Sequence, residues 1–277
     1  MNNEAVPEKL IVLKAGGSLL ERGLSQELAS DIQKVSVLNK IVLVHGGGIE
    51  VTEMAKKLGK EQRFIISPDG FRSRYTDQET VEIYTMVMAG KLSKQLVRML
   101  ASKGVRAVGL SGLDGSLLRA ERKKRLVIIN ERGRKMAIDG GYTGRIVGVN
   151  TELLRLLIDS KYVPVISPVA IGDEYESLNV DGDRTAANVA AALRADLLVL
   201  LTDVEGLLID GKRIPKITVG QAKEMIPRIG PGMITKLQAA IDAIEQGVGE
   251  VVITSGGVQN AVSSALAHQN GTVISHE

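Results

Sequence analysis

The sequence predicts an α/β fold, a three-layer αβα sandwich built on an open and mainly parallel sheet. Short runs of Val, Ile and Leu without polar alternation recur along the chain, and such runs are typical of strands covered on both faces. Longer segments of helical period lie between them, the order expected of parallel strands joined by crossover helices. With 277 residues, 44% of them hydrophobic, the chain can form a large core.

The elements alternate along the chain with one interruption. The apolar runs predicted as strands, the last of them at a sheet edge, are 10–14, 41–45, 105–110, 163–166, 197–202, 251–254 and 272–274. The segments predicted as helices are 25–38, 48–58, 77–102, 150–160, 183–194, 232–246 and 259–267. The segment 116–145 instead has short apolar pieces separated by charged turns and glycines, which predicts β-hairpins. We expect a single domain over 1–277, with an N-lobe (1–175) and a C-lobe (176–277) sharing one sheet.

The composition excludes several classes of protein. The chain has no cysteine, which rules out disulfides and thiolate chemistry, and only three histidines, so we expect no metal site built by the protein. A formal net charge of +3 does not indicate a nucleic-acid-coating protein. No leader is recognisable, and no apolar run approaches the roughly 20 residues that span a bilayer. A cytoplasmic protein without membrane contact is therefore expected.

Two glycine motifs follow the first two predicted strands. They are LKAGGSLL at 13–20 and VHGGGIE at 44–50. The carboxyl ends of parallel strands form the ligand crevice of such folds, and bare amides at a helix start suit anions. Glycine also serves simply to turn a chain. Two motifs on neighbouring strands nevertheless favour one phosphate or carboxylate site, although the P-loop, dinucleotide and protein-kinase motifs are absent.

Two lysines are candidates for stabilising a transferred phosphoryl group, whose charge spreads over several oxygens in the transition state. Lys14 ends the first predicted strand, and a lysine at the end of a buried strand needs a reason. Lys236 lies one turn into a predicted helix. An ordinary solvated charge is the alternative, chiefly for Lys236. For His45, which ends the second predicted strand, we expect a structural hydrogen bond rather than proton transfer.

The stretch LNVDGDRTAANVAAAL at 178–193 supplies polar partners for these lysines. Asn179, Asp181 and Asp183 alternate before an alanine-rich helix, so in an extended segment their side chains would point the same way. Either aspartate could simply cap the helix. Because one cap explains one aspartate, we expect Asp183 to orient the two lysines and Asn179 to hydrogen-bond a substrate.

Two further polar groups are candidates for ligand binding. Thr202 and Asp203 follow the fifth predicted strand and precede a hairpin turn at 210–211. This edge of the sheet suits a nucleotide, although the stretch taken alone is only a turn. Arg72 and Arg74 precede the long predicted helix and form either a carboxylate clamp or ordinary surface charge.

Together these motifs resemble the amino-acid kinase family, most closely its acylglutamate-kinase branch. The resemblance follows the family's order along nearly the whole chain, through LKAGGSLL, VHGGG, RSRYTD, VGLSGLDG, LNVDGDRTA, LTDVEGLL and GPGMITKLQAA. It implies an enzyme in which ATP, bound with Mg²⁺, donates its γ-phosphoryl group to the side-chain carboxylate of an amino-blocked acidic amino acid. It also implies that the N-lobe binds the acceptor and the C-lobe binds ATP.

The resemblance implies a role for each matching residue. The residues that match the family's phosphoryl-stabilising lysines and the aspartate holding them are Lys14, Lys236 and Asp183. The residues that match acceptor-binding positions are Gly47, Gly48, Arg74 and Asn179. The residues that match positions facing the phosphoryl group or the nucleotide are Gly16, Gly17, Thr202, Asp203 and Lys212.

Departures from the branch pattern narrow the expected substrate. Tyr75 follows Arg74 where free N-acetylglutamate kinases usually have a small residue, and Asp181 replaces the second asparagine of their Asn-x-Asn-x-Asp pattern. GLSGLDG at 109–115 and YTG at 142–144 instead resemble a lysine-biosynthesis branch. That branch acts on 2-aminoadipate attached to a small acidic amino-group carrier protein, LysW, and some members accept carrier-bound glutamate for arginine synthesis. A free N-acetylglutamate kinase is one alternative; a non-catalytic nucleotide or amino-acid sensor is another, disfavoured by the intact lysine–aspartate trio.

The expected partners are a carrier protein and a second copy of the chain, with no nucleic acid. The basic segment 116–145 has nine Lys or Arg against three Asp or Glu, a net charge of +6, which suits docking of an acidic protein. A solvated hairpin with scattered charge is the alternative. The long predicted helix fits either dimerisation, as in the family, or core packing through Ile83, Val87, Leu96 and Leu100. We expect too few residues before the first strand for the extra helix of hexameric, arginine-sensitive relatives.

Overall fold

One sheet takes strands from both halves of the chain. The computed structural model describes residues 7–277 except 22, 69 and 71, and within this part the largest sheet has eight strands. In sheet order they are β16 (Lys216–Thr218), β18 (Thr272–Ser275), β17 (Glu250–Ser255), β13 (Leu197–Thr202), β1 (Leu10–Ala15), β2 (Lys40–His45), β10 (Val163–Ser167) and β5 (Ala107–Ser111). Neighbours are parallel except β17 and β18. The mainly parallel sheet is confirmed, but the unpredicted three-residue β16, not β18, forms the edge.

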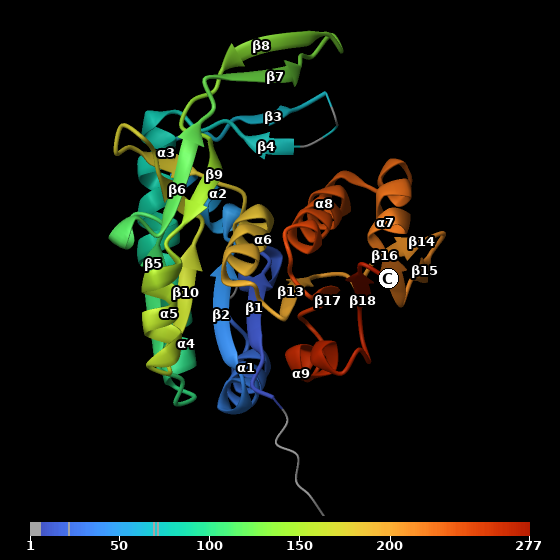
Figure 1. Cartoon of the computed structure of the whole chain (residues 1–277). Coiled ribbons are helices and arrows are strands. Elements are labelled where there is room, and N and C mark those ends of the chain that lie inside the picture. Colours follow the sequence, from blue (N-terminus) through green and yellow to red (C-terminus); the bar gives the residue numbers. More distant parts are fainter. Residues whose placement is uncertain (1–6, 22, 69, 71) are drawn as a thin grey trace, which may run out of the picture.

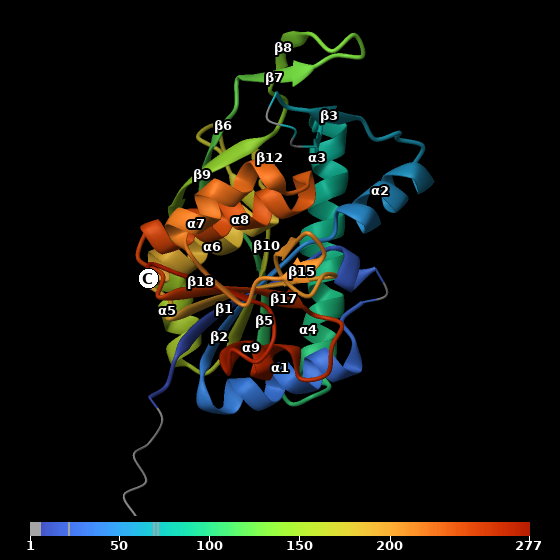
Figure 2. The same ribbon diagram turned by 90° about the vertical axis from the view of Figure 1, so that its right-hand side faces the viewer.

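Helices cover both faces of this sheet and give the predicted three layers (Figure 1 and Figure 2). One face packs against α1 (Gln26–Leu38), α4 (Ser93–Ala101) and α9 (Ala261–Leu266). The other packs against α5 (Thr151–Asp159), α6 (Gly182–Leu193), α7 (Val219–Met225) and α8 (Pro231–Glu245). In β1, Ile11 and Leu13 point to the face covered by α1, α4 and α9, and Val12 points to the opposite face. Burial of both faces explains why the strands are unbroken apolar runs.

The long helix predicted over 77–102 changes its winding in the middle. Asp77 caps α3 (Gln78–Thr85) by accepting a hydrogen bond from the Thr80 amide at 2.8 Å, and a π-helical segment, Met86–Leu92, connects α3 to α4. The apolar residues considered for dimerisation are all buried within this chain: Ile83, Val87, Leu96 and Leu100. They therefore pack in its own core. The π-helical segment shares a small core with α2 (Gly48–Lys57), and such segments often occur at functional sites.

Short strands lie outside the main sheet, and several stand beyond its upper end in Figure 1. Their bounds are β3 (Phe64–Ile66), β4 (Arg72–Arg74), β6 (Leu118–Arg122), β7 (Arg125–Ile129), β8 (Lys135–Asp139), β9 (Gly144–Val149), β11 (Val169–Ile171), β12 (Ser177–Asn179), β14 (Leu208–Ile209) and β15 (Lys212–Arg213). The pairs β6–β9 and β7–β8 are antiparallel, as predicted for 116–145. The β3–β4 hairpin was not predicted, because three-residue strands leave no periodic signal. Single 3₁₀ turns lie at Ser18–Leu20, Asp114–Ser116 and Ile226–Arg228.

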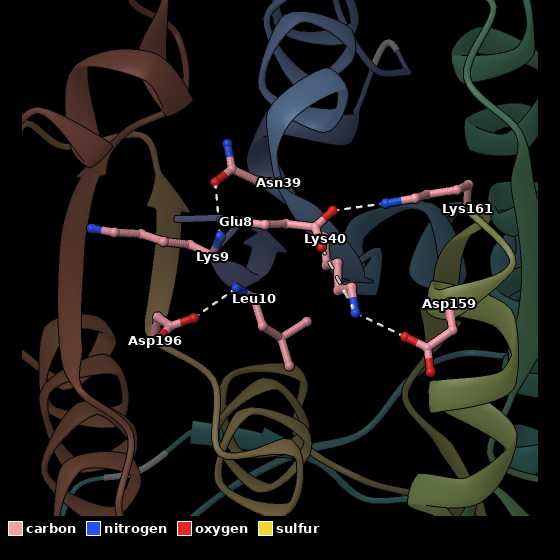
Figure 3. Close-up of polar contacts among 8 residues, drawn as sticks. All are labelled: Glu8, Lys9, Leu10, Asn39, Lys40, Asp159, Lys161 and Asp196. Atoms are coloured by element: carbon pink, nitrogen blue, oxygen red, sulfur yellow. Dashed lines mark hydrogen bonds and ion pairs between the residues drawn. The ribbon is translucent and has the colours of Figure 1, made fainter. Parts of the chain in front are cut away.

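Polar contacts connect the amino ends of the central strands (Figure 3). Asp196, just before β13, accepts a hydrogen bond from the Leu10 amide at 2.7 Å, and Lys40 of β2 pairs with Asp159 of α5 at 2.8 Å. The same figure shows the contacts of Glu8 with Lys161 and of the Lys9 amide with Asn39. Exposed ion pairs contribute little stability. These contacts connect segments that are far apart in the sequence.

Two expectations concern parts of the chain beyond these elements. We expect too few residues for a helix before the first strand. This expectation concerns mainly residues 1–6, which lie outside the described residues. Among the residues that the structure does describe, no helix has both the length and the apolar character needed to cross a membrane.

A buried carboxylate joins α1 to α9 and generates a stability prediction. Asp31 Oδ2 accepts the amides of Val262 at 2.7 Å and Ser263 at 3.2 Å, donors in the first turn of α9. Asp31→Ala removes their acceptor, so we expect the free energy of unfolding to fall by about 1–3 kcal/mol in urea denaturation. Asp31→Asn keeps one acceptor oxygen and should lose less. The exposed Lys34→Ala in α1 is the control, and equal stability of Asp31→Ala and this control would contradict the prediction.

Candidate active site

Two glycine loops touch at the carboxyl ends of β1 and β2. Because these strands are parallel neighbours in register, the loops that follow them lie side by side. A Cβ on Gly46 would lie 2.8 Å from the amide nitrogen of Gly17, and one on Gly47 would lie 2.1 Å from Cδ1 of Leu92. Only glycine permits this approach without rearrangement. The motif at 44–50 contains Gly46, but the sequence alone does not single it out, because the backbone that a side chain there would meet comes from the other loop.

Three amides in these loops have no acceptor within the described chain: those of Gly17, Gly47 and Gly48. The amides of Gly16 and Gly46, by contrast, donate to carbonyl groups of neighbouring strands. A Cβ on Gly17 would lie 3.2 Å from the Gly47 nitrogen and 3.5 Å from that of Gly48, so the three unpaired amides share one small space. Gly47 is also the N-cap of α2, where the helix dipole favours negative charge. This arrangement suits anionic oxygen atoms.

Three charged side chains meet beside the glycine loops. Lys14 Nζ of β1 lies 2.7 Å from Asp183 Oδ1 of α6, and Lys236 Nζ of α8 donates to Asp183 Oδ2 at 3.1 Å. The exposed fractions of the three side chains are small: 7% for Lys14, 6% for Asp183 and 17% for Lys236. Burial acts to raise the pKa of Asp183, but the two lysine charges and their hydrogen bonds outweigh burial and hold this pKa below its usual value. The trio therefore keeps a net positive charge for an incoming anion.

The start of α6 gives its two aspartates different contacts. Asp181 is the N-cap, since its Oδ1 accepts the Arg184 amide at 2.9 Å. Asp183 is buried in the first turn and contacts the lysines instead. Asn179 ends β12, and its Nδ2 donates to Thr76 Oγ1 at 2.9 Å. Asp181 therefore caps the helix, and Asp183 forms the ion pairs with the lysines.

Arg74 reaches the glycine loop from the β3–β4 hairpin. Its Nη2 donates to the Gly48 carbonyl oxygen at 2.6 Å and to Thr52 Oγ1 at 2.9 Å, and its Nη1 donates to Gln62. Burial lowers the pKa of the Arg74 guanidinium, which nevertheless stays charged near neutral pH. Arg72, on the same strand, is exposed. The two arginines therefore do not form a symmetric clamp: Arg74 is built into the site and Arg72 lies at its rim.

A cavity of about 1330 Å³ opens at the glycine loops. Its lining includes these predicted site residues: Lys14, Gly17, Gly47, Gly48, Arg74 and Asn179. Leu126 and Val127 of β7 also line it, so the basic hairpin forms part of the wall. The structure thus brings the candidate acceptor-binding residues to one space, with the buried Asp183 beside Lys14.

The candidates for nucleotide binding lie outside the lining of that cavity. Thr202 is buried at the end of β13 and donates to Asp203 Oδ1 at 3.0 Å. Lys212 is exposed on the β14–β15 hairpin. The Gly16 amide donates to the Leu201 carbonyl oxygen at 3.0 Å. The first glycine loop therefore lies between the end of β13 and the loop that follows β2.

The donor set fits phosphate groups better than a metal held by the protein. Across the described residues, no three His, Asp or Glu side chains are grouped closely enough to hold a metal ion. Unpaired amides and ammonium groups instead suit phosphate oxygens. A Mg²⁺ ion in such a site would be held chiefly by the phosphates of a nucleotide and by water.

Curated relatives match the chain along nearly its whole length. A LysW-aminoadipate/LysW-glutamate kinase from Sulfolobus acidocaldarius is 47% identical over 266 residues, covering 96% of this chain and 100% of the relative. A protein from Cenarchaeum symbiosum that carries the same name provisionally is 54% identical over 265 residues, covering 96% of this chain and 99% of the relative.

Solved structures and a family model agree with this similarity. N-acetylglutamate synthase from Neisseria gonorrhoeae, complexed with coenzyme A and N-acetyl-glutamate, matches with a TM-score of 0.81 and 25% identity over 98% of this chain, which spans 60% of that longer chain. Carbamate kinase from Giardia lamblia bound to AMP-PNP matches with a TM-score of 0.67 and 16% identity, over 96% of this chain and 98% of that one, and supports the fold alone. The model of the amino acid kinase family matches residues 9–255. The chain belongs to the amino acid kinase family.

Proposed function

We propose that the chain is an ATP-dependent kinase of lysine and arginine biosynthesis. It phosphorylates the side-chain carboxylate of carrier-linked 2-aminoadipate, glutamate, or both, to an acyl phosphate. The observation that carries the proposal is the buried Asp183 carboxylate between Lys14 and Lys236, next to three unpaired glycine amides. The names of relatives at 47% and 54% identity support the carrier-linked acceptor.

The residues of the site suit in-line transfer by positioning and electrostatics. ATP, bound with Mg²⁺, supplies the γ-phosphoryl group. Lys14 and Lys236 offer positive charge to the phosphoryl oxygens, and Asp183 keeps both ammonium groups in place before the reaction. Gly16 and Gly17 face the transferred group. The acceptor carboxylate is already an anion, so the reaction needs no general base.

The acceptor occupies the cavity, which residues of the N-lobe (1–175) line together with residues of the C-lobe such as Asn179. Its reacting carboxylate receives hydrogen bonds from the Gly47 and Gly48 amides, and Asn179 lies beside its blocked nitrogen. Arg74 binds the α-carboxylate. Within the described chain its guanidinium donates three hydrogen bonds, which leaves two of its five N–H groups for the substrate.

The nucleotide occupies the C-lobe, 176–277. Thr202 and Asp203 at the end of β13, together with Lys212 on the neighbouring hairpin, are its proposed contacts. Their position on the far side of the first glycine loop supports this division, because the γ-phosphoryl group must pass between donor and acceptor beside Gly16 and Gly17.

The basic segment 116–145 is the proposed docking site for the acidic carrier. Its exposed cations without an ion-pair partner in the described chain are Lys124, Arg125, Arg132, Arg134 and Lys135. Arg145, by contrast, pairs with Glu121 at 2.5 Å. The hairpin that carries the unpaired cations also contributes Leu126 and Val127 to the cavity wall. A carrier bound there would hold its attached amino acid close to the glycine loops.

A cytoplasmic homodimer completes the proposal. The core apolar residues of the long helix are not available for a dimer contact, since they are buried within the chain. Other residues would have to form it, and Met86 on the same helix is 58% exposed. Support for this part of the proposal comes from the family alone.

Substitution of Lys14 and Lys236 tests the observation on which the proposed function rests. Lys14→Ala and Lys236→Ala each remove one cation from the transferred group, so we expect kcat to fall by at least about 100-fold, measured by hydroxamate trapping of the acyl phosphate. Each variant leaves Asp183 one lysine, and circular dichroism checks that folding is retained. Lys56→Ala, at an exposed position in α2, is the matched control. Near-normal turnover of both active-site variants would refute the assignment.

A comparison of acceptors tests the substrate class. We expect kcat/KM for carrier-linked aminoadipate or glutamate to exceed that for free N-acetylglutamate by at least about tenfold. The two carrier-linked substrates differ by one methylene, which is worth roughly 10–200-fold in a pocket. A faster reaction with the free acetylated acid would favour the arginine-pathway alternative, and no acyl phosphate from any acceptor would favour a sensor.

Charge reversal on the hairpin tests carrier docking. The substitutions exchange four exposed cations for Glu: Lys124, Arg125, Arg132 and Lys135. We expect KM for the carrier-linked substrate to rise at least about tenfold at low salt, with the difference narrowing at high salt and KM for ATP unchanged. Arg122 and Lys123 are left intact, because Arg122 donates to the Gly141 carbonyl at 2.7 Å and Lys123 is half-buried.

The matched control for that experiment reverses the same number of exposed lysines on other elements: Lys34, Lys56, Lys57 and Lys216. It changes the net charge by the same amount without altering the hairpin. Similar KM values in the two multiple variants would mean that overall charge, not this hairpin, attracts the carrier.

A further inference from the structure

His45 is fully buried at the end of β2, and both of its ring nitrogens have partners. Nδ1 lies 2.9 Å from the carbonyl oxygen of Gly46, and Nε2 lies 2.8 Å from Oγ of Ser167, the last residue of β10. Ser167 Oγ also lies 3.1 Å from the carbonyl oxygen of Met88 in the π-helical segment. A series of polar contacts therefore connects that segment and β10, through the imidazole, to the second glycine loop.

These partners determine the tautomer of His45. A carbonyl oxygen only accepts hydrogen bonds, so Nδ1 carries the proton and donates to Gly46. Burial lowers the pKa of His45 to about 4 against the opposing effect of the Gly46 hydrogen bond, and the charge of Lys14 acts in the same direction as burial. The ring is therefore neutral near pH 7, and its Nε2 accepts the single hydroxyl hydrogen of Ser167. With this tautomer the hydroxyl does not donate to the Met88 carbonyl oxygen, which stays a neighbouring polar atom 3.1 Å away.

The hydrogen bond to Gly46 determines where the next amide points. All peptide bonds in the described chain are trans, and in a trans peptide the carbonyl and the following N–H point in opposite directions. With the Gly46 carbonyl turned toward the imidazole, the Gly47 N–H points away from it. A Cβ on Gly17 would lie 3.2 Å from the Gly47 nitrogen, so that amide group lies next to the other glycine loop. His45 thus directs one of the unpaired donors of the site.

The loop has no side chain of its own that could hold this peptide. Glycine peptides have wide conformational freedom, and a flipped Gly46–Gly47 peptide would present a carbonyl oxygen to the site in place of an N–H donor. That oxygen would repel an anion. Leu92 and Met88 pack against Gly47 and limit the space around it. Packing alone does not select which end of the peptide faces the site.

We propose that His45 is a positioning residue, which acts through the Gly46 carbonyl to keep the Gly47 amide directed at the acceptor carboxylate. The inference rests on the proposed carboxyl kinase function. His45 contacts no reacting group in this account and moves no proton. Its chemical contribution is a neutral donor of fixed orientation.

Two substitutions separate the two ring nitrogens. His45→Asn places an amide nitrogen near the position of Nδ1, where it donates to Gly46; His45→Gln reaches toward Nε2 and Ser167 and leaves Gly46 without its donor. We expect His45→Gln to lower kcat/KM for the acceptor at least about 30-fold, with KM for ATP changed less than about twofold. His45→Asn should lose at most about fivefold. Each variant gives up one buried hydrogen bond, so their midpoints in urea should be similar.

The outcomes distinguish this inference from the proposed function. Equal losses in the two variants, or losses that simply follow their stabilities, would overturn the positioning role. Absence of acyl phosphate formation by the unsubstituted protein would overturn the proposed function instead. If neither variant folds, long-range ¹H–¹⁵N NMR of the unsubstituted protein determines the tautomer of His45. The protein has only three histidines, which keeps the spectrum simple. The Nδ1–H tautomer of His45 is expected near pH 7, and the Nε2–H tautomer would overturn the inference.

Discussion

The position of β1 between β2 and β13 is the constraint on which the candidate site depends. Both pairings are parallel, so three strands from distant parts of the chain end at the same edge of the sheet. The loop after β1 consequently meets the loop after β2 on one side and the end of β13 on the other. Lys14, at the end of the central strand, lies where these segments converge and reaches α6 above the sheet. Backbone pairing, rather than side-chain contacts, thus assembles the two halves of the site.

The buried ion-pair trio adds charge to this framework at a cost. Removing a carboxylate and ammonium groups from water is unfavourable, and close opposite charges with good geometry offset it. Asp183 satisfies two lysines at once, so one desolvated anion holds two cations that would otherwise repel each other. Under the proposed function, the surplus positive charge of this largely buried trio acts more strongly on a phosphoryl group than it would in water. On that proposal, the same burial that costs stability makes the lysines effective.

Sequence reasoning located the features that are local in the chain. A strand that ends in Lys14 and runs into Gly16 and Gly17 is visible in adjacent letters, and the hairpins of 116–145 follow from their turns. The distinction between Asp181 as cap and Asp183 as ion-pair partner could be expected from chemistry and from the family resemblance, because one cap needs one aspartate.

Features that depend on contacts between distant segments could not be predicted in this way. Ser167 meets His45 across 122 positions, and no spacing rule links them. The β3–β4 hairpin makes Arg74 part of the site and leaves Arg72 at the rim; residue type alone does not reveal this difference, and only the family resemblance singled out Arg74. The need for glycine at position 46 arises only from its contact with Gly17, which the sequence does not show. The π-helical winding at Met86–Leu92 likewise leaves no periodic signal in the sequence.

A site built from backbone amides also limits where acceptor specificity can arise. The Gly47 and Gly48 donors are fixed by β2, by α2 and by the His45 contact, so they cannot shift to follow a longer or shorter side chain without moving a central strand. Under the proposed function, glutamate and aminoadipate differ by one methylene between the reacting carboxylate and the blocked nitrogen. The difference must then be absorbed at the other end of the substrate, where Arg74 and Asn179 stand on short strands outside the main sheet. On this proposal, chain-length preference is a property of the β3–β4 hairpin and β12 rather than of the glycine loops.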